Sequence, residues 1–151
     1  MPNYDNYNNI LAALTSCKSI KNKIFLFKNK DYDEKSSRHY HLALPISKNE
    51  YILLVMFLSK VEKIARRYKL IGRGEDSLVF FNKDDMDFLT AEKSVLDCNK
   101  PIYLSFEELA SKVYNKLSIF ECNIADEYIA LIKQAIKKSP EVKPTLKKKL
   151  L

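Results

Sequence analysis

The sequence predicts a single α+β domain, in which about five helices pack with a small mixed or antiparallel sheet of about four short strands. Its 151 residues, 46% of them apolar, are enough for one packed core. Helical and strand-like periodicities alternate along the chain, which is typical of this class. We place the domain at residues 1–139 and expect residues 140–151 to form a basic tail that is flexible or docked.

The first third of the chain predicts one helix followed by two strands. Apolar residues recur at helical spacing over residues 7–17, and Asp5 can cap the helix that they form. The β-branched and aromatic run at residues 23–28 predicts a buried strand. Residues 40–44 alternate like a second strand, which Pro45 is expected to end.

One long helix is predicted at the centre of the chain. Ser47 and Glu50 match a capping box, the pattern in which two side chains cap the first turn of a helix. We expect this helix at residues 48–68, followed by a break at Gly72–Gly74 and a strand at residues 77–81. The apolar stripe of the helix is Tyr51, Leu54, Leu58, Val61, Ala65 and Tyr68.

The remainder of the chain predicts three more helices and one short strand. Acidic residues 84–85 favour a helix start, because negative charge is stabilising near the amino end of a helix. A strand at residues 101–104 leads into a second capping box, Ser105 with Glu108, and a helix at residues 105–117. The final helix is expected at residues 123–139. Its inward positions are Ile124, Tyr128, Ile129, Ile132, Ala135 and Ile136.

Charge is segregated along the sequence. Of the formal net charge of +7, residues 133–151 carry +6, because seven lysines there face only Glu141. Residues 60–73 hold six basic residues against Glu62, whereas residues 75–97 hold seven acidic residues against two lysines. The predicted domain is therefore dipolar rather than uniformly basic.

The basic residues of the central helix are the candidate partner-binding face. They recur at helical spacing on the helix and just after it, and the terminal lysines can join them if the tail folds back. The face is Lys60, Lys63, Arg66, Arg67, Lys69 and Arg73, and the tail adds Lys147, Lys148 and Lys149. Such a face is either simply solvated or contacts an anionic partner: an acidic protein surface, a nucleic acid backbone or anionic lipid.

Reactive groups are few and scattered. His39 and His41 share one face of a predicted strand, and either could pair with one of the three cysteines, which are Cys17, Cys98 and Cys122. No local spacing supplies further metal ligands, and glycine is too scarce for a phosphate-binding loop. We predict no metal and no cofactor, and regard an enzyme using a cysteine or the two histidines as an alternative.

These observations favour a small intracellular protein that binds or regulates another macromolecule, in the manner of an inhibitor or effector. Its expected partner is a protein with an acidic surface; nonspecific nucleic acid binding is the alternative. The excess of lysine over arginine, 22 to 4, favours an AT-rich bacterial or phage genome. The first residues lack a secretory signal, and no apolar run approaches a membrane span, so we expect a cytoplasmic protein, or one delivered from the cytoplasm without a cleavable signal peptide.

Overall fold

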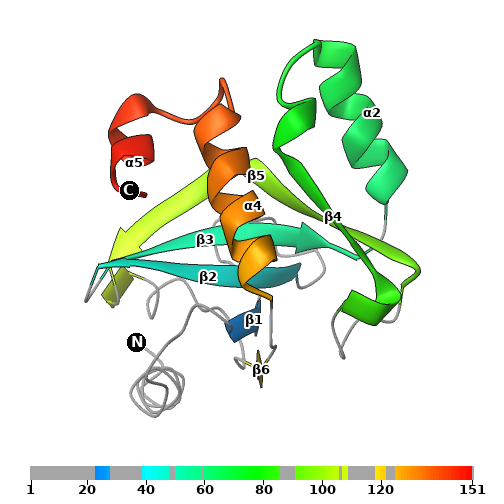
Figure 1. Ribbon diagram of the computed structural model, residues 1–151. Helices are drawn as coiled ribbons and strands as arrows, with labels where there is room; N and C mark the ends of the chain where they lie inside the picture. The colour runs from blue at the N-terminus through cyan, green and yellow to red at the C-terminus, as the bar shows by residue number, and fades with distance from the viewer. Residues whose placement is uncertain are drawn as a thin grey trace, which may run out of the picture.

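The computed structural model describes residues 23–27, 39–47, 50–58, 60–85, 91–105, 107–108, 118–121 and 125–150 (Figure 1). The strands are β1 (Lys23–Phe27), β2 (His39–Ser47), β3 (Glu50–Phe57), β4 (Leu78–Asn82), β5 (Lys93–Ser105) and β6 (Ser118–Glu121). The α-helices in these ranges are α2 (Val61–Ile71), α4 (Asp126–Lys138) and α5 (Pro144–Lys148), and two 3₁₀ helices are η1 (Glu75–Ser77) and η2 (Lys83–Asp85).

The strands form one antiparallel sheet in the order β4-β5-β3-β2-β1-β6. The α+β class is therefore confirmed, with six strands in the sheet rather than about four. The described ranges contain three α-helices instead of the five expected along the whole chain. None of the helices in these ranges is long and apolar enough to cross a membrane.

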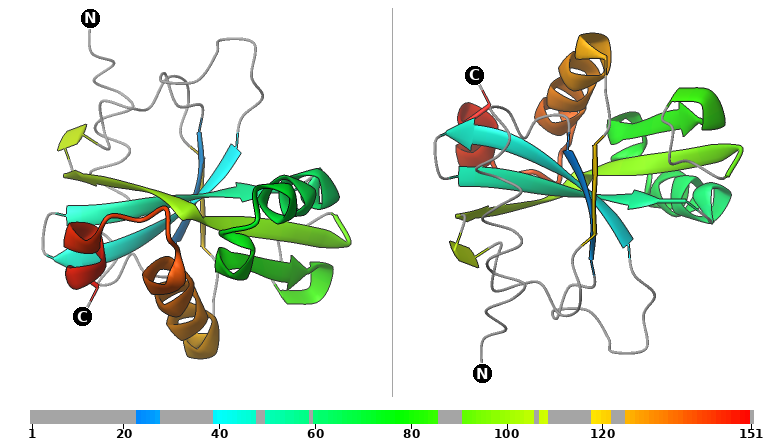
Figure 2. Two further views of the ribbon diagram at one scale, coloured as in Figure 1. Left: turned by 90° about the horizontal axis from the view of Figure 1, so that it is seen from above. Right: turned by 90° about the horizontal axis from the view of Figure 1, so that it is seen from below.

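Helices cover both faces of the sheet. Figure 2 shows α4 on one face and α2 on the other. Because successive strand residues point to opposite faces, Val79 and Leu96 join the core beneath α4, whereas Leu78 and Val95 pack against α2. The α4 side also buries Leu42, Leu44, Ile52, Leu54, Met56, Phe81, Ile132 and Ile136.

The predicted helix at residues 48–68 is wrong in its first half, because residues 50–57 form β3. All residues from Tyr51 to Met56 are buried, since β3 lies between two other strands of the sheet. A strand buried on both faces has a continuous apolar run, which fits a helical period equally well. Ser47 and Glu50 do not cap a helix but face each other across the β2–β3 connection. The helix begins only at Val61.

The predicted strand at residues 101–104 is part of a longer strand, β5, which begins at Lys93. Its first half escaped sequence reasoning because Asp97 and Asn99 are polar, yet both are buried. β5 also carries an irregularity: Leu53 pairs with Ile102 and Val55 with Asp97, so residues 98–101 lie opposite Leu54 alone. Such a bulge bends a strand and redirects its side chains.

Several local predictions are confirmed. Strands occur at β1 and β4 as expected, and α4 ends at Lys138 with buried residues at the expected inward positions from Ile129 to Ile136. Gly72 follows α2 with φ +81°, a left-handed conformation that glycine adopts without strain. The second capping box is present, since the Glu108 N–H donates to Ser105 Oγ and the Ser105 N–H donates to Glu108 Oε1.

Two further predictions are corrected, and two more concern residues that the structure does not describe. β2 continues through Pro45 to Ser47, because there it pairs with β3 alone, and proline is tolerated where one side of a strand has no partner. Residues 84–85 belong to a short 3₁₀ turn, η2, and not to a described α-helix. The helix predicted near residues 5–17 and most of the one at 105–117 lie outside the described residues.

The segment that follows α4 packs against the domain. Val142 and Leu150 are buried in the same core cluster as α4, with Leu146 packed against it. α5 begins with Pro144, a residue whose fixed backbone angle suits the first turn of a helix. The basic end of the chain is thus docked, which places its lysines at definite positions on the surface.

Candidate functional site

The basic residues predicted on the central helix form an exposed surface of α2. All six cations are exposed, while Ile64 and Tyr68 on the opposite side of the helix are buried. Two large apolar side chains lie among them: Leu70 is 81% exposed and Ile71 is 58% exposed. We define the α2 surface as Lys60, Lys63, Arg66, Arg67, Lys69 and Arg73 together with Leu70 and Ile71.

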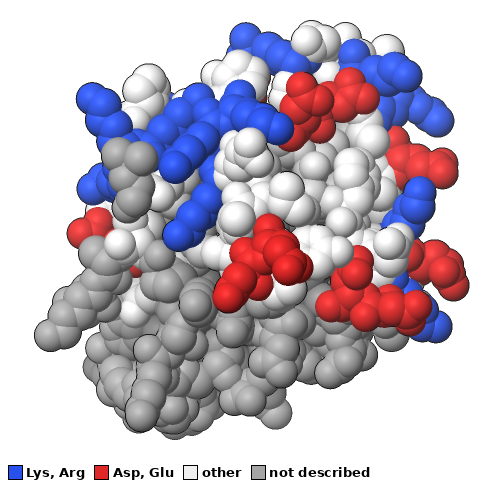
Figure 3. All heavy atoms as spheres, in the orientation of Figure 1, with Lys and Arg blue, Asp and Glu red and all other residues white. Residues whose placement is uncertain are grey.

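The lysines of the tail do not join the α2 surface. α5 lies at the other end of the molecule from α2 in each view of Figures 1 and 2. Figure 3 shows basic side chains gathered at the upper left and upper right, with acidic side chains between these two groups near the top and more of them lower on the molecule. The predicted set is therefore divided into two separate basic regions.

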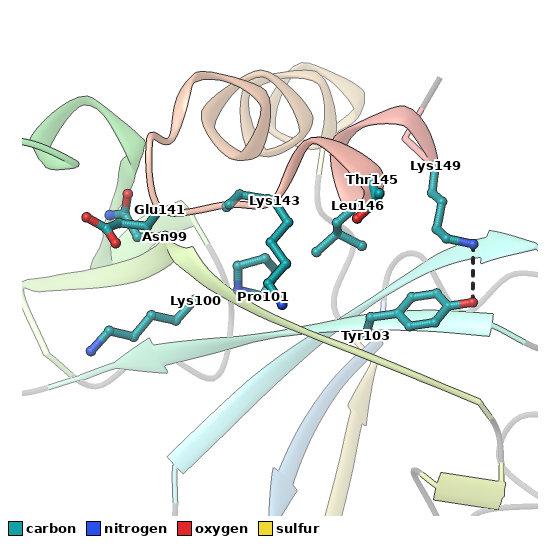
Figure 4. Close-up of a pocket in the computed structure, with 10 residues that line it drawn as sticks. Asn99, Lys100, Pro101, Tyr103, Glu141, Lys143, Thr145, Leu146 and Lys149 are labelled. Atoms are coloured by element: carbon teal, nitrogen blue, oxygen red, sulfur yellow. Dashed lines mark hydrogen bonds between the residues drawn. The ribbon is translucent and has the colours of Figure 1, made fainter.

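The second basic region is concave. A groove of about 520 Å³ separates β5 from the segment that follows α4 (Figure 4). Its β5 wall holds Lys100, Pro101 and Tyr103, and its other wall holds Lys143, Leu146 and Lys149. We call this the β5 groove. Its volume falls within the range of pockets that hold small molecules or short peptide segments.

The bulge and the uneven strand lengths create this groove. β4 pairs only with residues 93–97 of β5, so beyond Asp97 no described strand lies on that side of β5. The bulge at residues 98–101 begins where this pairing ends, and Lys100 and Pro101 within it line the groove. The docked segment after α4 supplies the facing wall.

Two of the charged groups in the groove have defined partners. The Lys149 ammonium lies 4.8 Å from the centre of the Tyr103 ring, donates to its hydroxyl at 3.4 Å and lies 3.8 Å from Glu50 Oε2. Glu141 is paired with Arg73. The Arg73 hydrogen bond, helped by the charges of Arg73 and Lys100, lowers the pKa of the Glu141 carboxyl. The groove thus has three ammonium groups and two nearby carboxylates, of which Glu141 is paired with Arg73 and Glu50 with Lys149.

A buried polar network connects the two basic regions. The Tyr68 hydroxyl of α2 donates to Asp97 Oδ2 at 2.6 Å, and the Asn99 N–H donates to Asp97 Oδ1 at 2.9 Å. The Asn99 amide donates to the Gly74 carbonyl at 2.8 Å and accepts from the Ser139 hydroxyl at 2.6 Å. Burial, followed by the hydrogen bond to Asp97, raises the pKa of Tyr68. The network satisfies polar groups that would otherwise be costly to bury.

The predicted reactive groups do not meet in the part of the chain that the structure describes. Cys98 is fully buried in the core beneath α4, and burial raises the pKa of its thiol, with Asp97 adding to the effect. His41 is also fully buried, on a strand that lies between β1 and β3. It points to the opposite face from Leu42, which packs in the α4 core with Cys98.

The remaining catalytic candidates are not described. Cys17, Cys122 and the side chain of His39 lie outside the described part of the chain. Among the described residues no three histidine, cysteine or acidic side chains are grouped as metal ligands.

Sequence reasoning missed Lys100 and Tyr103 and gave Lys143 no role. Lys143 lies about 40 positions from Lys100 and Tyr103 along the chain, and only the docking of the carboxy-terminal segment brings it to the same groove. The one available signal was the polar Asp97–Asn99 pair just before Pro101, which marks a strand irregularity.

Comparisons with protein-family models, with curated proteins and with solved structures found no match to this chain.

Proposed function

We propose that this protein binds an acidic partner protein through the α2 surface and acts by that contact. The observation that carries the proposal is the exposure of Leu70 and Ile71 among six cations on one short helix and its two flanks. An exposed apolar pair rimmed by charge is typical of a surface that becomes buried in a complex.

The arginines support a protein partner over a nucleic acid. Three of the four arginines of the chain, Arg66, Arg67 and Arg73, belong to the α2 surface, although lysine is more than five times as frequent overall. Arginine binds carboxylates through two parallel hydrogen bonds and is enriched at the centres of protein interfaces. Contact with a phosphate backbone needs positive charge but gains little from Leu70 and Ile71.

Buried contacts hold α2 in a fixed position, which favours binding of a partner without rearrangement of the helix. Ile64 and Tyr68 anchor its inner side, and the Tyr68 hydroxyl is held by Asp97. Gly72 ends the helix by donating its N–H to the carbonyls of Tyr68 and Lys69. The exposed side chains therefore project from a fixed backbone, which lowers the entropy lost when a partner binds.

Affinity capture from an extract of the source organism tests the proposal. The wild-type protein is compared with Lys63→Glu/Arg67→Glu, with Leu70→Ala, and with Lys147→Glu/Lys148→Glu as a charge-matched control on α5. We expect an acidic protein to be retained by the wild type and the control, lost with Lys63→Glu/Arg67→Glu, and bound about tenfold more weakly by Leu70→Ala.

Leu70→Ala separates the proposal from its alternative, because it removes apolar area without changing charge. Retardation of DNA or RNA that is lost with Lys63→Glu/Arg67→Glu but is unchanged with Leu70→Ala would identify the α2 surface as a nucleic acid site. That result, or equal retention of proteins by all four variants, would overturn the proposal.

A further inference from the structure

We infer that the β5 groove is a second binding site, which takes an extended acidic peptide as an additional strand along β5. This inference does not depend on the function proposed for α2, because the residues that carry it line the β5 groove and do not belong to the α2 surface, which meets the groove at the Arg73–Glu141 pair. It rests on three observations: an edge of β5 that pairs with no other described strand, three ammonium groups beside that edge, and an apolar floor between the walls.

The open edge is the carboxy-terminal half of β5. Residues 102–105 pair with β3 on one side, and no described strand pairs with them on the other. The Ser105 N–H is used by the capping box with Glu108, so it faces away from β3. Because hydrogen-bonding groups alternate along a strand, Tyr103 presents its N–H and carbonyl to the same open side. A peptide laid along this edge would find main-chain partners, the basis of recognition by strand addition.

The charges beside the edge select an acidic occupant. Figure 4 shows Lys143 extending from the carboxy-terminal segment toward Pro101, and Lys149 reaching from α5 to Tyr103. With Lys100 they make three cations, against two carboxylates: Glu141, which is paired with Arg73, and Glu50, which lies 3.8 Å from the Lys149 ammonium. A lysine-bearing peptide would be repelled, whereas alternate glutamates or aspartates would meet ammonium groups on the facing wall.

The floor and rim accommodate the other side chains of such a strand. Pro101 and Leu146 line the groove, and Tyr103 is 41% exposed at its edge. The side chains of an added strand alternate between two directions, so a peptide that alternates acidic and β-branched residues can place one set on the lysines and the other on this apolar lining.

Binding of a blocked peptide of alternating glutamate and valine tests the inference. The probe carries a fluorophore, and its anisotropy is measured with the full-length protein at low salt. Two matched peptides serve as controls: one with lysine in place of glutamate, and one with the same glutamates but with alternate backbone nitrogens methylated. Methylation removes the N–H donors that strand addition needs and leaves the charge unchanged. We expect binding of the first peptide alone.

Variants of the protein locate the site. Lys143→Glu/Lys149→Glu is expected to weaken binding by at least about tenfold, whereas Lys63→Glu/Arg67→Glu on α2 should leave it unchanged. Circular dichroism and thermal unfolding check that each variant is folded. In the wild type, the backbone amide of Tyr103 should exchange its hydrogen more slowly when the peptide is bound, since it then donates to the added strand.

Several results would overturn the inference. Equal binding of the methylated and unmethylated peptides would show attraction by charge without strand addition. Tighter binding of an oligothymidylate or of inorganic tripolyphosphate at the same lysines would make the groove a site for phosphate anions. Absence of any peptide binding, or loss of binding with the α2 variant alone, would also refute it. The last result would leave the proposed function of α2 intact, which keeps the two proposals distinguishable.

Discussion

The two basic regions of this protein are built in different ways. The α2 surface is convex, and its cations come from fourteen consecutive residues, 60–73, of one helix and its flanks. The β5 groove is concave, and its cations come from a strand bulge and from a docked segment at the other end of the chain. The first depends on local periodicity and the second on tertiary packing. A substitution that disturbs tertiary packing should therefore affect the β5 groove more than the α2 surface, unless it alters the buried hydrogen-bond network that joins them.

The largest effect is expected at that network, from Gly74→Ala. Gly74 has φ +87°, and an added Cβ would lie 2.9 Å from Asn99 Oδ1 and 2.9 Å from Tyr68 Cδ1. Backbone strain together with this clash should lower the free energy of unfolding by about 2–5 kcal/mol. Urea denaturation measures the loss.

Gly72→Ala is the matched control for this change. Gly72 has a similar φ of +81°, but nothing lies within 4 Å of a Cβ placed there. Only the backbone strain remains, so its cost should be about 1–2 kcal/mol. Equal losses of unfolding free energy in the two variants would mean that the close contacts of Gly74 with Asn99 and Tyr68 add nothing to stability. The network would then not couple the two basic regions.

An intermediate effect is expected from Leu150→Ala, which should affect the groove alone. Leu150 is 5% exposed and packs in the core with Val142. Its truncation should cost about 2–3 kcal/mol. Leu131→Ala, on an α4 side chain that is 49% exposed, should change stability by less than about 0.5 kcal/mol.

The expected consequence of Leu150→Ala is a selective loss of function. Peptide binding in the β5 groove should weaken, because the wall that carries Lys143 and Lys149 is released, while binding to the α2 surface persists. Loss of both activities would indicate that the carboxy-terminal segment supports the whole domain and not one wall of the groove.

The smallest effect is expected from Arg73→Ala, which breaks the ion pair between the loop after α2 and the segment after α4. Both side chains are well exposed, and such pairs contribute little to stability. The pKa of Glu141 is lowered in the folded protein from a usual value of 4.5, so the pair stabilises above that pH. The stabilisation is lost as the pH falls through the lowered pKa. The urea midpoints of wild type and Arg73→Ala should therefore differ slightly at neutral pH and converge in acid. A difference in urea midpoint that persists in acid would show that the Arg73–Glu141 ion pair is not its cause.

Local patterns in the sequence predicted those parts of the fold that depend on neighbouring residues. The stripe from Ile129 to Ile136 identified the buried side of α4, and the exchange of hydrogen bonds between Ser105 and Glu108 followed from their spacing alone. The exposed cations of α2 also followed from helical spacing. In each case the partners lie within one or two turns, so the energy that decides the conformation is local.

The same reasoning failed where a neighbour in space decides the conformation. Glu50 to Phe57 has an apolar run that serves a helix or a buried strand, and the choice was made by β2 and β5 on either side of it. Asp97 and Asn99 looked like loop residues, because their partners Tyr68, Gly74 and Ser139 are distant in sequence.

The sequence by itself therefore determined the class of the fold, the carboxyl end of α4 and the distribution of charge along the chain. Tertiary structure decided that the centre of the chain is a strand and that Lys149 lines the β5 groove together with Lys143 and Lys100 instead of joining α2. The physical reason is range: capping and helical amphipathicity act over a few residues, whereas strand pairing and burial of Val142 and Leu150 depend on surfaces that only the folded chain presents.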